Sequence, residues 1–547
     1  MLCTIRKLRS VRIVFLFCVL ASFSQTVQAD DVSALSERLD ALERENRLLK
    51  MDLDELRQER SPWHNVSETS AEPPDSSGDA KSNTDAAAAK KNTSSGDAKE
   101  GTKAPSVHAK PSSDSSKEKK EDPLSFSAKW NNGFEATTKN KAFKFHVGGR
   151  VQFDGVWIQD DTNAFAGPGV GNFTDQDSVD FRRARLRADG TMYETLDWAL
   201  EFDFVNSINA DPTAGAEESN VDHVPAPTDL WMTFRELPVV GNVRVGNMKE
   251  PIGFEHLHSS RYLDFLERSY GQDAFYGASN NGFTPGIMAF DNWDEEHGTW
   301  STGFFKNTVN PFAYGIGDGE YAWTSRVTYL PWFEEKGRYL MHLGVAGSMR
   351  DPALKNGQQN YRARGSLRNG PGPLTPVIAN TRAFTTSQVD FGALEAAIQI
   401  DSVLIEAEYI CGVNKDSVGN GFSAPAGAAL GDVVFSNWYV QALYFLTGEH
   451  REYETKSAVF GRVIPHRNYG DGGHLGAWQI GARYNVLDLV DSGVDGGYLE
   501  DVTLGLNWFL NPNLKVQTNY CYTIRDAQAG VEHGDYYGVG TRIAWDF

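Results

Sequence analysis

Cysteine is scarce in this 547-residue sequence, which contains four. Two of them lie within the first twenty residues, and only Cys411 and Cys521 follow. Each of these two lies in a strand-like run, so the sequence predicts neither a disulfide scaffold nor a cysteine metal site. Two structural thiols are the simpler interpretation.

Long apolar runs are also absent from most of the chain. At the N-terminus a basic segment at 6–12 precedes an apolar stretch at 13–23 and then Val27-Gln28-Ala29. This pattern predicts a signal peptide over residues 1–29, cleaved after Ala29, whose apolar part is too short to span a bilayer. Beyond it no run of about 18 apolar residues remains, which leaves a soluble fold or a β-barrel.

An excess of positive charge is missing, because 52 Lys and Arg stand against 73 Asp and Glu, a net charge of -21. Nucleic acid is therefore not an expected partner. Anion transport stays open, since selectivity depends on the residues that line a pore. Catalytic motifs are missing too: the chain has no Gly-x-Ser-x-Gly, no zinc-type histidine pair on a helix, and no Lys-Ser/Thr after the glycines at 167–171. We predict no enzyme activity, catalytic residue, metal or cofactor.

The N-terminal part of the mature chain has two contrasting segments. Residues 30–60 carry apolar residues in three-four alternation, which predicts a short α-helical coiled coil that self-associates in parallel. Its seam comprises Val32, Leu35, Leu39, Leu42, Asn46, Leu49, Leu53 and Leu56. A single amphipathic helix on another surface is the alternative. Residues 61–125 are rich in Ser, Asp, Lys, Ala, Pro and Gly, which predicts a disordered linker.

Residues 126–547 consist of short, aromatic-rich alternating runs, apolar on one face and polar on the other. This pattern fits an all-β, 16-stranded antiparallel transmembrane β-barrel whose apolar face meets lipid, although a soluble sandwich shares the alternation. Loop lengths favour the barrel. Long polar loops are expected around 160–177, 207–228, 249–283, 350–385 and 413–435, and tight turns at 195–197, 237–241 and 511–513. The long connection at 447–475 breaks this pattern and leaves the count open by one hairpin.

Several stretches in order resemble the family of phosphate-selective porins O and P. They are Gly149–Gly155, Phe181–Arg187, Gly190–Tyr193, Val243–Glu255, Phe265–Ser269, Gly481–Tyr484 with Leu487–Leu489, and Leu506–Asn513. The resemblance implies a homotrimeric outer-membrane barrel that conducts phosphate or other small anions, with its third loop folded inward at the constriction. The coiled coil would lie in the periplasm, in possible contact with the cell wall or a protein there.

Strand parity identifies candidate pore residues. Arg183, Arg185 and Arg187 share one face of a strand, and we expect that face to line the lumen because Arg facing lipid near the midplane costs about 2 to 4 kcal/mol. A row of guanidiniums would form successive weak anion sites. The structural alternative is that they pair with Glu201 and Asp203. Arg182 falls on the other face, so we expect it at the strand's end in the interfacial zone.

Other candidates follow from parity and from the resemblance. Arg150, Arg244 and Lys144 should be lumenal, Lys144 near the periplasmic end. By resemblance, Lys249 lies near the constriction, unless it pairs with Glu250 or Glu255. Asp229 could accept a hydrogen bond from a protonated phosphate. The interfacial girdle is predicted to include Trp157, Trp231, Trp438, Trp508 and Trp545, although some could pack at a trimer seam.

These residues predict passive diffusion of anions, with phosphate or polyphosphate preferred. A broader-specificity porin is the alternative in the same class. A third hypothesis makes the barrel an anchor that tethers the envelope through the coiled coil, and an outer-membrane hydrolase is the remaining enzyme option.

Overall fold

The computed structural model describes residues 125–160, 177–208, 224–276, 282–308, 310–312, 314–317, 319–368, 377–526 and 533–547. The predicted signal peptide, the coiled coil and the linker up to residue 124 lie outside the described residues. Within these ranges, no helix is both long enough and apolar enough to cross a membrane.

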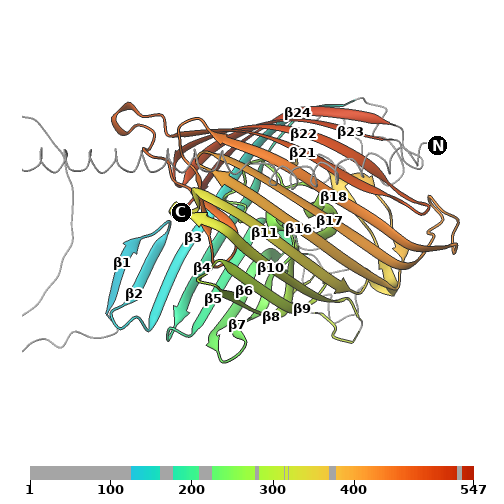
Figure 1. The fold of residues 1–547 in the computed structure, drawn as a ribbon, viewed down its shortest axis with the longest axis horizontal. Coiled ribbons are helices and arrows are strands. Elements are labelled where there is room, and N and C mark those ends of the chain that lie inside the picture. Colours follow the sequence, from blue (N-terminus) through green and yellow to red (C-terminus); the bar gives the residue numbers. More distant parts are fainter. Residues whose placement is uncertain are drawn as a thin grey trace, which may run out of the picture. The chain divides into compact units, whose positions relative to one another are not determined.

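Sixteen antiparallel strands close into a barrel, as predicted (Figure 1). The last strand pairs with the first, from Tyr536↔Asp160 to Asp546↔Arg150. In chain order the wall consists of β3 (Phe143–Asp160), β4 (Ser178–Met192), β5 (Leu196–Ile208), β6 (Val224–Leu237), β7 (Gly241–Lys249), β8 (Phe283–Trp293), β9 (Gly298–Lys306), β10 (Tyr321–Glu334), β11 (Tyr339–Arg350), β16 (Gln388–Ile400), β17 (Val403–Val418), β18 (Ala429–Phe445), β21 (Ala477–Asp491), β22 (Val494–Asn511), β23 (Leu514–Arg525) and β24 (Gly534–Asp546).

The wall follows the predicted alternation. On β4 the residue Arg185 is 8% exposed and Leu186 is 48% exposed, because their side chains point to opposite faces of the sheet. On β5, Glu201 and Asp203 are buried and Leu200 is exposed in the same way. The outer face is therefore a belt of apolar side chains, suited to lipid, and the charges turn inward.

Short connections gather at one end of the barrel, which we call the turn end; they include residues 193–195, 238–240, 401–402 and 512–513. The opposite, loop end carries loop L3 (residues 250–282) and loop L5 (351–387), close to their predicted bounds. The predicted loop at 413–435 is wrong in extent, because β17 and β18 continue to Val418 and from Ala429 through register irregularities. The connection 446–476 lies at the turn end, and its two strands stay out of the wall, so the count of sixteen holds.

Two additional strands extend the sheet before the barrel begins. β1 (Phe126–Trp130) and β2 (Phe134–Thr138) form a hairpin, and β2 pairs with β3 from Phe134↔Val147 to Thr137↔Lys144. This hairpin lies beside β3 in Figure 1.

The remaining elements belong to the connections. L3 contains α3 (Phe254–Leu257) and the helical turn η2 (Gln272–Tyr276). L5 contains the turn η5 (Lys355–Gly357) and the strands β12 (Gln358–Gln359), β13 (Arg362–Arg364), β14 (Val377–Asn380) and β15 (Phe384–Thr385). The turn-end connections contain η4 (Glu335–Gly337), η7 (Asp471–Gly473) and the strands β19 (Arg451–Glu454) and β20 (Val459–Val463).

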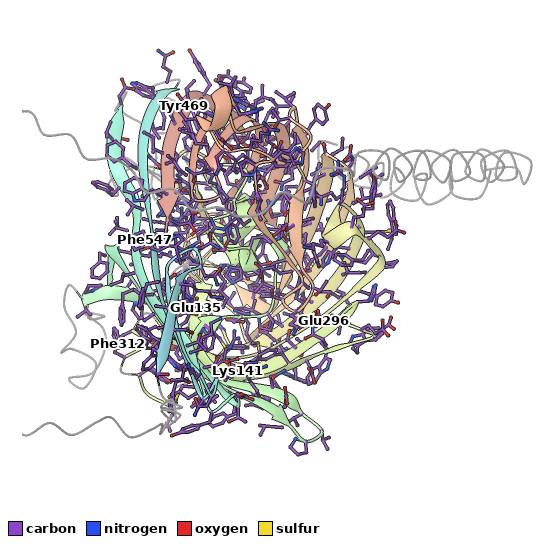
Figure 2. The ribbon with its side chains drawn as sticks, turned by 90° about the vertical axis from the view of Figure 1, so that its left-hand side faces the viewer. Glu135, Lys141, Glu296, Phe312, Tyr469 and Phe547 are labelled. Carbon is purple, nitrogen blue, oxygen red and sulfur yellow. The ribbon has the colours of Figure 1, made fainter. Side chains whose placement is uncertain are left out.

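Three segments fold into the barrel. L3 reaches the opposite wall, where the N–H of Leu266 donates to Asn519 Oδ1 on β23 at 2.6 Å. L5 joins it, because Arg364 donates to Asp273 Oδ1 of L3 at 2.6 Å. From the turn end the hairpin β19–β20, which we call the lumenal hairpin, pairs with L3 through Arg451 and Asp264. Figure 2 faces the end that carries Phe547 and shows the side chains of the described residues as sticks.

Glycines in the wall allow this close packing. A Cβ at Gly540 would lie 2.8 Å from Leu266 of L3 and 2.9 Å from Leu367 of L5. One at Gly505 would lie 2.9 Å from the Phe265 ring. The inward position of L3, which the resemblance implied, thus depends on small residues in the opposite wall.

Candidate functional site

The inserted segments leave a cavity of about 570 Å³ against the wall from β3 to β10. Ten arginines and two lysines line it, against five carboxylates, so the cavity is basic in a chain whose net charge is -21. Seven of the eight predicted site residues line it: Arg150, Arg183, Arg185, Arg187, Asp229, Arg244 and Lys249.

The arginines on β3 and β4 are partly neutralised by the neighbouring strand. Arg185 donates to Asp203 Oδ2 at 2.8 Å and to Glu201 Oε1 at 3.2 Å. Arg150 donates to the same Glu201 oxygen at 2.5 Å. The pairing with Glu201 and Asp203 that the sequence offered as an alternative is therefore present, and it coexists with a position on the cavity wall.

Arg182 is not interfacial, and the prediction for it was wrong. The β3–β4 register pairs Gln152 with Arg183 but Phe153 with Phe181, so Arg182 is the extra residue of a β-bulge. The bulge turns it into the lumen, where its guanidinium donates to both carboxylate oxygens of Glu267 in L3, at 2.7 and 3.0 Å. Period-two parity fails at a bulge.

Lys144 lies outside the cavity, contrary to its predicted pore-lining role. It is the second residue of β3, at the turn end, where β2 replaces β24 as the neighbouring strand. There its ammonium lies 3.2 Å from the carboxylate of Glu135 on β2, and its side chain is 44% exposed. The alternation of β3 alone could not predict this contact, because Glu135 belongs to a hairpin outside the barrel.

Trp231 was predicted for the girdle, yet it lines the cavity. Its indole N–H donates to Asp229 Oδ1 at 3.1 Å, and Arg187 donates to Asp229 Oδ2 at 2.7 Å. Both oxygens of Asp229 therefore already accept hydrogen bonds from the protein.

Three cations of the cavity have no carboxylate partner among the described residues. Arg244 donates to Thr233 Oγ1 at 3.0 Å. Lys249 and Arg268 donate to main-chain carbonyl oxygens of L3. The predicted alternative for Lys249, a salt bridge to Glu250 or Glu255, does not occur, because those carboxylates pair with Arg350 and Arg483. No carboxylate of the described residues therefore neutralises these three side chains.

The family described as phosphate-selective porin O and P matches residues 151–541. The chain belongs to this family. It is 24% identical over 467 residues to Porin O of Pseudomonas aeruginosa, covering 78% of this chain and 93% of that protein. It is also 24% identical over 432 residues to an uncharacterized protein of Caulobacter vibrioides, covering 76% of each.

Solved structures of outer-membrane proteins are also similar. DcaP, an outer membrane channel of Acinetobacter baumannii, is 12% identical with a TM-score of 0.43, covering 75% of this chain and 99% of that one. The trimer form of OmpT from Vibrio cholerae is 13% identical with a TM-score of 0.41, covering 74% and 100%. By its family and its barrel, the protein is an outer-membrane channel and not an enzyme.

Several residues that line the porin's cavity were missed from the sequence. Besides Arg182 they include the basic residues Arg261, Arg268, Arg326, Arg368 and Lys456. Arg261, Arg268, Arg368 and Lys456 come from L3, L5 and the lumenal hairpin, where strand parity gives no direction. The alternation in 451–463 was a usable signal for a hairpin, but nothing in it shows that the hairpin enters the lumen.

Two titratable groups of L3, Glu267 and His256, keep one protonation state. Burial alone would raise the pKa of Glu267, but the guanidiniums of Arg182 and Arg183 outweigh it and hold that pKa well below its ordinary value. Burial and the nearby ammonium of Lys249 hold the pKa of His256 well below its ordinary value, so this ring stays neutral. Among the described residues, no group of three or more His, Cys, Asp and Glu could hold a metal ion.

Proposed function

We propose that this porin conducts small anions by passive diffusion and prefers phosphate or polyphosphate. The proposal depends on the excess of cations on the cavity wall, three of which lack a carboxylate partner in the described part of the chain. A cation entering such a cavity is repelled, and an anion finds donors on several strands. The family to which the chain belongs is named for phosphate selectivity, which agrees with this charge pattern.

Conduction requires that anions bind and leave again. Arg244, Lys249 and Arg268 offer charge-assisted hydrogen bonds on two sides of the cavity, from the wall and from L3. Arg150 and Arg185, already paired, offer weaker sites through the donors that their carboxylates do not occupy. A phosphate therefore exchanges one set of donors for the next and is never held by a closed shell.

Assembly and orientation are part of the same proposal. By family resemblance the barrels form homotrimers, and the turn end faces the periplasm. The predicted coiled coil at 30–60 would then also lie in the periplasm, because β1 begins at the turn end.

The test measures the zero-current potential of purified, refolded protein in planar bilayers under a salt gradient, followed by phosphate titration against chloride. We expect anion selectivity and block of the chloride current by phosphate. Lys249→Ala should raise the phosphate concentration for half-block roughly ten- to a hundredfold, since a hydrogen bond to a charged group contributes about 1.5 to 3 kcal/mol. Arg185→Ala should weaken the block as well.

Lys144→Ala is the matched control, because it removes the same charge from a lysine outside the cavity. Its half-block concentration should equal that of the wild type. Cation selectivity of the wild type would contradict the proposal and assign the constriction to acidic residues. Anion selectivity without phosphate block would leave a broader anion porin.

A further inference from the structure

Arg244 is held by aromatic rings and a hydroxyl group. Its guanidinium carbon lies 3.9 Å from the centre of the Trp231 ring and 5.0 Å from that of Phe290. Its Nε–H donates to Thr233 Oγ1 at 3.0 Å. These partners come from β6 and β8, on both sides of the β7 strand that carries Arg244. Contacts from two sides fix the plane of the guanidinium.

The position of the Trp231 ring is itself fixed. Its indole N–H donates to Asp229 Oδ1 at 3.1 Å, and Asp229 in turn accepts from Arg187 at 2.7 Å. A continuous set of contacts therefore runs from β4 through Asp229 and Trp231 to Arg244. In this arrangement Asp229 acts through the indole and does not need to touch the permeating anion.

Arg244 differs from the other fixed arginines in what its partners do to its charge. Arg185 and Arg326 are fixed by carboxylates, which also neutralise them. Aromatic rings and a hydroxyl restrain Arg244 with no negative charge, and no described carboxylate lies within ion-pair distance of it. Its terminal N–H groups therefore combine a fixed direction with an uncompensated charge.

We infer that Trp231 and Phe290 are positioning residues that hold the guanidinium of Arg244 in one plane. Its paired terminal N–H groups, the fork of the guanidinium, then make the pore favour oxyanions over halides. The inference rests on the proposed anion function and adds to it the residues that position the selecting guanidinium. Two oxygens of a phosphate or carboxylate accept two parallel N–H bonds from a guanidinium, whereas a spherical halide gains nothing from the plane. Fixing the plane beforehand lowers the entropy lost on binding, and only oxyanions benefit.

The test compares phosphate with chloride permeability from zero-current potentials in bilayers, together with the phosphate concentration for half-block. We expect Trp231→Leu to lower the phosphate preference about three- to tenfold, the range of a cation–π contact. Trp231→Phe keeps a ring face and should recover most of that loss. Arg244→Lys keeps the charge but removes the fork, and should lower the preference as far as Trp231→Leu.

Asp229 separates this inference from a direct role in binding phosphate. Asp229→Asn keeps an oxygen that accepts the indole N–H but loses the bond from Arg187, so the preference should fall less than in Asp229→Leu. Phe304→Leu on the outer face of β9, where the side chain is 62% exposed, is the control and should match the wild type. If Trp231→Leu does not fold, as judged by heat-modifiable gel migration, Phe290→Leu carries the same expectation.

The outcomes for this inference and for the proposed function are distinct. A wild-type pore without phosphate preference overturns both. A preference that falls in Lys249→Ala but not in Trp231→Leu overturns the inference alone. An equal loss of the preference in Asp229→Asn and Asp229→Leu would show that the carboxylate itself meets the anion, and would also overturn it.

Discussion

The contact between the lumenal hairpin and L3 should control the width of the pore. Arg451 and Asp264 form an ion pair in which the side chains are 1% and 4% exposed. Arg451 also donates to the carbonyl oxygen of Tyr262 at 2.9 Å, and Asp264 accepts from Gln479 at 3.1 Å. Arg451→Met would leave Asp264 buried without its cation.

The size of the effect follows from burial. Removing one partner of a buried ion pair costs about 3 to 5 kcal/mol, which shifts an equilibrium by roughly a hundred- to several-thousandfold. The barrel wall has its own hydrogen bonds, so the cost acts on the docking of the two inserts. We expect a larger and noisier single-channel conductance, because L3 and the hairpin separate for part of the time.

Two further variants test whether the unpaired charge of Asp264 causes the change in conductance. Arg467→Met removes an exposed arginine from the same turn-end connection, where it contacts His474, and should leave the conductance unchanged. Arg451→Met combined with Asp264→Leu removes both charges and should restore much of the docking, because an apolar pair of similar volume replaces a buried ion pair at little cost. A double variant as open as the single one would show that a stranded charge is not the cause.

Three shorter predictions concern the wall and L3. A carboxylate whose pKa is lowered in the folded state stabilises the fold at pH values above its ordinary pKa, and this contribution is lost as the pH falls through the lowered pKa. Arg182→Leu should raise the pKa of Glu267. Acid-induced opening in bilayer recordings should therefore begin at a higher pH than in the wild type. Gly246→Ala, at φ +131° with a Cβ only 2.3 Å from a carbonyl oxygen of β6, should cost about 2 kcal/mol or more in urea unfolding, whereas Gly347→Ala, with 3.7 Å of clearance, should not. Leu186→Arg places a charge on the lipid face and should cost about 2 to 4 kcal/mol of barrel stability in the same assay.

The wall could be predicted from the sequence because its alternation has one physical cause throughout. Every strand has lipid on one side and the lumen on the other, so Leu186 and Arg185 must point in opposite directions. That rule gave a count of sixteen strands, open by one hairpin, and it placed five arginines of the cavity, Arg150, Arg183, Arg185, Arg187 and Arg244. It failed at Arg182, because a bulge adds one residue and reverses the parity locally.

The interior could not be predicted in the same way. Trp231 is of a residue type that is common in the interfacial girdle, and only its contacts with Asp229 and Arg244 distinguish it from a girdle residue. The lumenal hairpin and L3 meet through residues almost 190 positions apart, Arg451 and Asp264, and no local pattern encodes such a contact. The strands of the wall all follow the same alternation, whereas the positions of L3, L5 and the lumenal hairpin depend on individual side-chain contacts.

The hairpin of β1 and β2 covers the start of β3, which β24 leaves without a neighbouring strand. β3 has 18 residues, and β24 covers it only as far as Arg150, so its first residues would present unpaired N–H and C=O groups at the turn end. Such an open edge recruits strands from other chains. β2 covers it, and what remains is the short edge of β1, which carries Lys129. The porin thus protects an edge of the described sheet at which aggregation could start.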